Sequence, residues 1–249
     1  MKQLLFQELY KTYSKKSTYI AMIIQIILMI SMAFLSLKYP SLLESKTVFL
    51  DNYDGTLWIQ YVLIFLSSNI ILDEYKYGTI KLFLSKEFTR TQVYLSKVLF
   101  VFIQSLILYI LDIFMTFVIN VVISHNQISS SLLSSFFENI VSQFFVTWLI
   151  LSITLLLSTI FKSSGLSITI SIIYYFVSII SSNLMFGVIH KHTILRYNPM
   201  NLMNLTTQIN TESMKALTLL NTYEYFILIP IYIIVFITIG NIIFFKRNK

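Results

Sequence analysis

Cysteine is absent from this sequence of 249 residues, and glycine and proline number only 5 and 3. Without cysteine the chain can form no disulfide bond, no thiolate metal site and no cysteine nucleophile. Charge is also scarce, because 12% of the residues are charged while 56% are hydrophobic and 16% aromatic. A soluble domain of this length could not cover so much apolar surface with so few charged side chains. The composition therefore predicts an integral membrane protein.

Six stretches are apolar enough to cross a bilayer as helices, each of which requires roughly 20 residues. They are Thr18–Leu37, Leu57–Leu72, Lys97–Ile123, Phe136–Phe161, Leu166–Val188 and Tyr225–Phe245. We therefore expect an all-α polytopic membrane protein, with one transmembrane domain over residues 1–249. Between or before the spans lie three notable segments, at residues 1–17, 73–96 and 189–224.

The net charge of +7 could indicate a nucleic-acid partner, but the placement of the basic residues argues against one. Lysine and arginine flank the apolar stretches, which is typical of membrane topology signals. With both termini in the cytoplasm, only five of the 18 basic residues fall on the outer side, namely Lys38, Lys46, Lys191, Arg196 and Lys215. This asymmetry predicts a multi-pass protein of the cell membrane with cytoplasmic termini.

The first 17 residues, MKQLLFQELYKTYSKKS, have the periodicity of an amphipathic helix. At 100° per residue, one arc of this helix carries Leu5, Phe6, Leu9, Tyr10 and Tyr13. A helix with an aromatic face and a basic face lies in the membrane interface. The alternative is a positively charged flank of the first span, and the five-residue face favours the interfacial helix.

The densest run of charge, LDEYKYGTIKLFLSKEFTRTQVYLSKVL, joins the second and third spans on the cytoplasmic side. Gly78 and Thr79 offer a helix start, and apolar residues interleaved with charge follow. Such a helix either docks a partner protein through its apolar side chains or lies on the inner leaflet. Periodicity alone does not separate these two interpretations.

The order of residues in this loop closely resembles that of ABC-2 type permeases, the membrane subunits of ATP-driven exporters. The matching positions are Glu74, Gly78, Thr79, Thr89, Arg90, Tyr94 and Lys97. The sequence departs from the family pattern where a proline often precedes the Ser/Thr-Arg pair, because Glu87 and Phe88 stand there. The predicted interfacial helix, six spans and long segment before the last span also resemble the family.

This resemblance implies a coupling helix that sits in a groove of a separate ATP-binding subunit. It assigns that role to Glu74, Gly78, Thr79, Lys81, Phe83 and Arg90. None of the five glycines builds a G-x-x-x-x-G-K-[ST] loop, so ATP and Mg²⁺ are expected on the partner subunit, with no cofactor on this chain. The resemblance also implies a second permease subunit, identical or related, as in a homo- or heterodimer.

The resemblance further suggests a cargo. Small permeases of this kind in Gram-positive bacteria resemble those that export amphipathic peptides or give immunity to them, including bacteriocins and phenol-soluble-modulin cytolysins. Spans that are mostly apolar, with hydroxyls and few charges, suit an amphipathic or hydrophobic cargo. We therefore expect peptide export through the bilayer, without catalytic residues in this chain.

Polar residues inside the predicted spans add two hypotheses. Asp112 lies near the middle of the third span, where a carboxylate must face a cavity or a partner. It either lines the translocation path or is a hydrogen-bonded structural residue. In the fifth span a narrow arc of the helix carries Ser167, Ser171, Ser178 and Ser182. Small residues at that spacing favour helix packing, for example at a dimer interface, over a hydroxyl-lined path.

Three histidines, His125, His190 and His192, lie in predicted loops without clustered carboxylates or thiols, so no metal site is expected. An intramembrane enzyme would need paired Glu, His or Asp residues in adjacent spans, and only Asp112 lies deep. The remaining alternative to a permease is a non-transporting scaffold or sensor that docks a soluble partner on its cytoplasmic loop.

Overall fold

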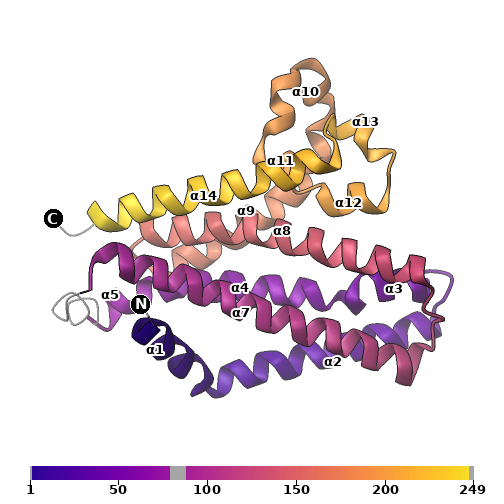
Figure 1. Cartoon of the computed structure of the whole chain (residues 1–249), viewed down its shortest axis with the longest axis horizontal. Coiled ribbons are helices and arrows are strands. Elements are labelled where there is room, and N and C mark those ends of the chain that lie inside the picture. The colour runs from indigo at the N-terminus through magenta and orange to yellow at the C-terminus, as the bar shows by residue number, and fades with distance from the viewer. Residues whose placement is uncertain (1, 79–87, 247–249) are drawn as a thin grey trace. The chain divides into compact units, whose positions relative to one another are not determined.

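The computed structural model describes residues 2–78 and 88–246. In these ranges all regular structure is helical (Figure 1). Six helical segments are long and apolar enough to cross a membrane: Lys16–Lys38, Asn52–Lys76, Arg90–Ser124, Ser130–Ile160, Ser164–Leu184 and Thr222–Lys246. The prediction of an all-α polytopic membrane protein with six spans is confirmed.

The chain divides into two compact units. Unit 1 comprises Met1–Leu63 and Ser96–Phe137, and unit 2 comprises Ile64–Leu95 and Glu138–Lys249. Along the chain, the boundaries between the units fall inside three long helices.

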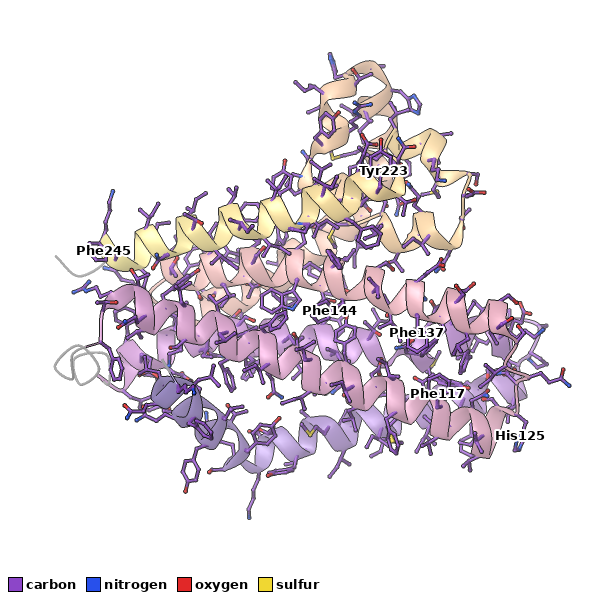
Figure 2. The ribbon with its side chains drawn as sticks, viewed as in Figure 1. Phe117, His125, Phe137, Phe144, Tyr223 and Phe245 are labelled. Atoms are coloured by element: carbon purple, nitrogen blue, oxygen red, sulfur yellow. The ribbon has the colours of Figure 1, made fainter. Side chains whose placement is uncertain are left out.

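The helices of unit 1 follow one another with few connecting residues. They are α1 (Lys2–Tyr13), α2 (Lys16–Lys38), α3 (Ser45–Leu50), η1 (Asn52–Asp54), the first part of α4 (Gly55–Ile70), most of α7 (Arg90–Ile119), η2 (Asn120–Ser124) and the start of α8 (Ser130–Ile160). An aromatic cluster joins α3, α7 and α8, with the Phe49 and Phe136 rings stacked at 5.0 Å and Phe117 edge-on to Phe136 at 5.3 Å (Figure 2). These rings fill space without polar atoms that need partners.

Unit 2 holds the rest of α4, α7 and α8, together with the later helices. These are α5 (Leu72–Lys76), α9 (Ser164–Leu184), α10 (Phe186–Lys191), η3 (Thr193–Tyr197), α11 (Pro199–Leu202), α12 (Leu205–Asn210), α13 (Met214–Thr218) and α14 (Thr222–Lys246). The short helices α10, α11, α12 and α13 gather near the start of α14 (Figure 1), whose two ends are marked by Tyr223 and Phe245 in Figure 2.

Buried amide side chains hold these short helices together. Asn201 donates to the carbonyl oxygens of Arg196 and Thr218, at 2.7 and 3.0 Å. Gln208 donates to the carbonyl of Leu220 at 2.9 Å and accepts from the Thr218 hydroxyl at 2.6 Å. Short helices expose many unpaired backbone groups at their ends, and these side chains satisfy several of them.

Several predicted boundaries are displaced in the structure. The second span covers Asn52–Lys76 instead of Leu57–Leu72, and the fourth begins at Ser130 instead of Phe136. The third span begins at Arg90 instead of Lys97, because Thr89 and Gln92 form a reciprocal cap: the Gln92 amide donates to the Thr89 hydroxyl at 3.3 Å, and the Thr89 amide to the Gln92 side chain at 3.0 Å. The fifth span ends at Leu184 instead of Val188, since a separate helix, α10, starts at Phe186.

Candidate coupling site and buried polar contacts

The residues that lead into the predicted coupling helix form α5 and its termination. Glu74 is buried in unit 2, and Gly78 adopts φ +69° just after the helix ends at Lys76. This left-handed conformation at the end of a helix is the one that glycine adopts without steric cost. Gly78 therefore ends a helix, whereas the sequence predicted a helix start at Gly78 and Thr79. The other three predicted coupling residues, Thr79, Lys81 and Phe83, lie outside the described residues.

Arg90, on the far side of the loop, contacts the end of the last helix. Its Nη1 donates to the carbonyl oxygen of Phe245 at 3.1 Å (Phe245 is labelled in Figure 2). Carbonyl groups in the last turn of a helix have no partner within the helix and carry partial negative charge. Arg90 thus caps α14, and the start of α7 is tied to the end of α14 within unit 2.

Aromatic side chains strengthen this connection. The ring of Phe244 lies 6.0 Å from that of Tyr75 in α5 and 5.7 Å from that of Tyr94 in α7. Gly240 packs against the Tyr94 hydroxyl so closely that a Cβ at this position would collide with it. Residues from both flanks of the loop therefore grip the last two turns of α14, a contact that the sequence analysis missed.

A further buried contact of α7 is with the N-terminal helix, α1. Lys97 Nζ lies 2.6 Å from Glu8 Oε1, and both side chains are buried in unit 1. Tyr13 donates its hydroxyl to Gln104 Oε1 at 3.1 Å. Burial raises the pKa of the Tyr13 hydroxyl, and the hydrogen bond to Gln104 opposes that shift. Sequence reasoning missed Glu8, although an acidic residue in an otherwise basic helix was a signal that it pairs with a lysine elsewhere.

The predicted apolar face of α1 divides between two environments. Leu4 and Glu8 form the buried side of the helix, whereas Phe6 and Tyr10 are 71% and 77% exposed. Leu5, Leu9 and Tyr13 are half-buried. Exposed aromatic side chains beside a basic face are typical of a helix in the membrane interface.

Asp112 is fully buried in unit 1 and accepts three hydrogen bonds. The donors are Gln25 in α2 at 3.0 Å, Asn52 in η1 at 2.7 Å and Thr56 in α4 at 3.2 Å. Gly55 lies so close to the carboxylate that a Cβ there would collide with it. The carboxylate thus connects three helical elements at the start of α4. The sequence allowed Asp112 to be a hydrogen-bonded structural residue, but it did not reveal these three partners.

The turn that carries Asn52 has an unusual backbone. Asn52, Tyr53 and Asp54 have φ angles of 56°, 49° and 59°, a left-handed conformation that is costly for residues with a side chain. A second hydrogen bond also holds this turn, because the Tyr53 hydroxyl donates to the Ser124 hydroxyl at 2.9 Å. The local strain therefore serves to point Asn52 at Asp112.

The serine arc of α9 faces inward. Ser167, Ser171, Ser178 and Ser182 are all buried within unit 2, and Ser68 of α4 donates to the Ser171 hydroxyl at 3.5 Å. The outward side of α9 carries exposed apolar residues, including Leu166, Ile173 and Ile180. The arc packs against the chain's own helices, so its assignment to a dimer interface or a translocation path remains a prediction.

Within residues 2–78 and 88–246, no group of three or more His, Cys, Asp or Glu side chains is arranged to hold a metal ion. The candidate coupling site in unit 2 is the contact of the loop flanks with α14. In unit 1, the Glu8–Lys97 ion pair and the polar junction at Asp112 are two separate buried polar contacts.

The six spans define a polytopic membrane protein. The flanks of the loop between its second and third spans contact the last span. The family model described as ABC-2 family transporter protein matches residues 4–178, more than half of the chain. The chain therefore belongs to the ABC-2 transporter family. This family comprises membrane components of ABC transporters, which lack an ATPase of their own and generally work with an ABC ATP-binding subunit. A comparison with curated proteins found no match.

Proposed function

We propose that this chain is the permease subunit of an ATP-driven exporter, powered by a separate ATP-binding subunit that docks on the 73–96 loop. The observation that carries the proposal is the grip of both loop flanks on α14. Arg90 caps the end of that helix, and Tyr75 and Tyr94 pack against Phe244. A push on the loop would reach a membrane span directly, because packed side chains transmit displacement.

The proposed cargo is an amphipathic or hydrophobic peptide. Charged residues are rare within the spans that the structure describes, and the carboxylate of Asp112, near the middle of the third span, is engaged by three donors. A path without free charges disfavours ions and sugars, whose polar groups need partners in hydrocarbon. The resemblance that the sequence suggests to permeases of Gram-positive bacteria that export peptides is the basis for proposing a cytolysin or bacteriocin, with export and immunity as the two forms of the role.

The proposed assembly contains two permease subunits, identical or related, and two ATP-binding subunits. ATP and Mg²⁺ would bind to the latter alone. Both chain termini would lie in the cytoplasm, in agreement with the excess of lysine and arginine on that side.

The deciding experiment is purification of the chain in mild detergent from its native membrane, followed by mass spectrometry of the accompanying proteins. We expect an ATP-binding subunit in stoichiometric amount, and its loss from the Phe83→Asp variant. Ile194→Asp is the matched control, because Ile194 is an exposed apolar residue of the 189–224 segment. Retention of the subunit by Phe83→Asp would refute the docking site.

The second candidate function is a scaffold or sensor that docks another soluble partner on the same loop. The apolar and charged residues of the loop would serve that role equally well. Purification without any ATP-binding subunit, even after crosslinking, would favour this alternative.

A further inference from the structure

The junction at Asp112 has more acceptors than donors. Asp112 Oδ1 accepts from Gln25, and Oδ2 accepts from Asn52 and Thr56. No lysine, arginine or histidine forms an ion pair with Asp112 in the described ranges. When Asp112 is ionised, its negative charge is therefore stabilised only by these three neutral donor groups. A charged residue inside a membrane span is by default a candidate functional site.

Two buried atoms beside this carboxylate have no partner. Gln25 Oε1 and Asn52 Oδ1 make no hydrogen bond, although both residues are almost completely buried. Each atom belongs to an amide whose nitrogen donates to Asp112, so both lie within a few ångströms of the carboxylate. Both are acceptors and neither can serve as a donor. The junction therefore lacks two donors, and the smallest group that supplies one of them is a proton.

We propose that Asp112 is a proton-binding site at the junction of α2, η1, α4 and α7. A hydronium ion gives up one O–H bond and leaves as water, while its proton forms an O–H bond at Oδ2 and makes the carboxyl group neutral. The Asn52 amide then rotates by half a turn, so that Oδ1 replaces Nδ2 and accepts the new O–H bond. The distance of 2.7 Å between Asn52 Nδ2 and Asp112 Oδ2 matches the usual O–H···O separation.

Burial of Asp112 favours uptake, because removal from water disfavours the charged form of a carboxylate. Asp51 and Asp54 are the titratable side chains that flank the Asn52–Tyr53 pair in the chain. The residues that face Asp112 from α2 and α4 are Gln25, Met29, Gly55 and Thr56, none of which titrates. The start of α4 opposes uptake, because a helix N-terminus favours an anion. The site is thus balanced between the two forms.

Proton uptake would weaken three contacts at once. Hydrogen bonds to an ionised carboxylate are roughly twice as strong as bonds between neutral groups. On protonation, the hydrogen bonds from α2, η1 and α4 to the Asp112 carboxylate all lose this extra strength. The contact that holds the strained turn at Asn52–Asp54 weakens with them. The junction would therefore have two states, tight when Asp112 is ionised and loose when it is neutral.

Infrared spectroscopy of the full chain in lipid vesicles tests the proposal. The chain has four aspartates, Asp51, Asp54, Asp73 and Asp112, and Asp112 alone is fully buried. With ¹³C-carboxyl aspartate, we expect an isotope-shifted carbonyl band of a protonated, desolvated acid to grow between about pH 9 and about pH 4. The band should be absent from Asp112→Asn. If the spectra of the two proteins change identically over this range, Asp112 binds no proton and the proposal is overturned.

A second variant keeps the test decisive if Asp112→Asn fails to fold. Thr56→Val removes one donor to the ionised form while keeping the side-chain volume. We expect it to raise the pH of half-protonation of the labelled band by about one unit, because a hydrogen bond to a charged group is lost. Thr56→Ser keeps the hydroxyl and should leave that pH within a few tenths of wild type. An unchanged or lowered pH in Thr56→Val would also overturn the proposal, and neither result depends on an ATP-binding subunit.

Discussion

Lys97 in α7 and Glu8 in the N-terminal helix form a buried ion pair, with 2.6 Å between Nζ and Oε1. The two residues are 89 positions apart in the sequence and fasten α1 to α7. Burial of a charged pair is costly, so each partner depends on the other. The pair therefore decides whether α1 stays docked.

Replacement of Glu8 by Gln should destabilise unit 1 by about 3–5 kcal/mol, because it removes the negative charge that lies 2.6 Å from the buried Lys97 ammonium. Lys11→Met is the control. Lys11 also contacts Glu8 at 3.0 Å, but its side chain is 44% exposed, and pairs of this kind contribute only about 0–1 kcal/mol. Thermal unfolding in detergent, followed by circular dichroism, measures both. Equal effects of the two variants would contradict the prediction.

Gly240 is expected to reject a larger residue. In Gly240→Ala the new methyl group would collide with the Tyr94 hydroxyl, and overpacking of this kind costs about 1–3 kcal/mol. The double variant with Tyr94→Phe should recover part of that loss, because the hydroxyl is the atom first met. Gly187→Ala, where a Cβ meets nothing within 4 Å, is the control. No difference in melting temperature between Gly240→Ala and Gly187→Ala would refute this packing.

Arg90→Gln should separate coupling from docking. The variant loses the guanidinium that caps α14, while the apolar residues proposed to dock the ATP-binding subunit are unchanged. We expect the subunit to co-purify normally and cargo-stimulated ATP hydrolysis to fall about tenfold, equivalent to about 1.4 kcal/mol. Lys76→Gln, on the other flank of the loop, is the charge-matched control. Loss of the subunit from Arg90→Gln would instead place Arg90 in the docking contact.

Tyr13 predicts an alkaline limit to the docking of α1. Burial raises the pKa of its hydroxyl above the ordinary value of 10.0, so the neutral side chain is favoured in the folded protein. The resulting stabilisation is complete below the unfolded pKa and is lost as pH rises through the folded one. Tyr13→Phe should therefore flatten the fall in stability above about pH 10. The same decline in wild type and Tyr13→Phe would show that Tyr13 does not contribute.

Much of the fold could be predicted from the hydropathy of the segments and from capping residues close in sequence. The six spans follow from sequence because a bilayer selects for apolar length, which is a property of each segment taken alone. Even the early start of α7 at Arg90 was readable in principle, since Thr89 and Gln92 have the spacing of a capping box. The loop pattern also identified the family, which the match over residues 4–178 confirms.

Contacts between distant segments were not readable in this way. Asp112 is 87, 60 and 56 residues from its donors Gln25, Asn52 and Thr56, and no periodicity links such positions. The sequence placed Asp112 inside a span and required a polar partner for it, because a lone carboxylate is costly in hydrocarbon. Which partner it has depends on how three helices pack and on a left-handed turn that residue propensities disfavour.

The same division holds for α1 and α9. The sequence by itself determined that each helix has two faces, since side-chain direction repeats every 3.6 residues. Only the tertiary structure decided which face is buried: Glu8 turns inward to meet Lys97, and the serines of α9 turn toward the chain's own helices. Amphipathicity is a local property, whereas burial depends on the neighbour that packing supplies.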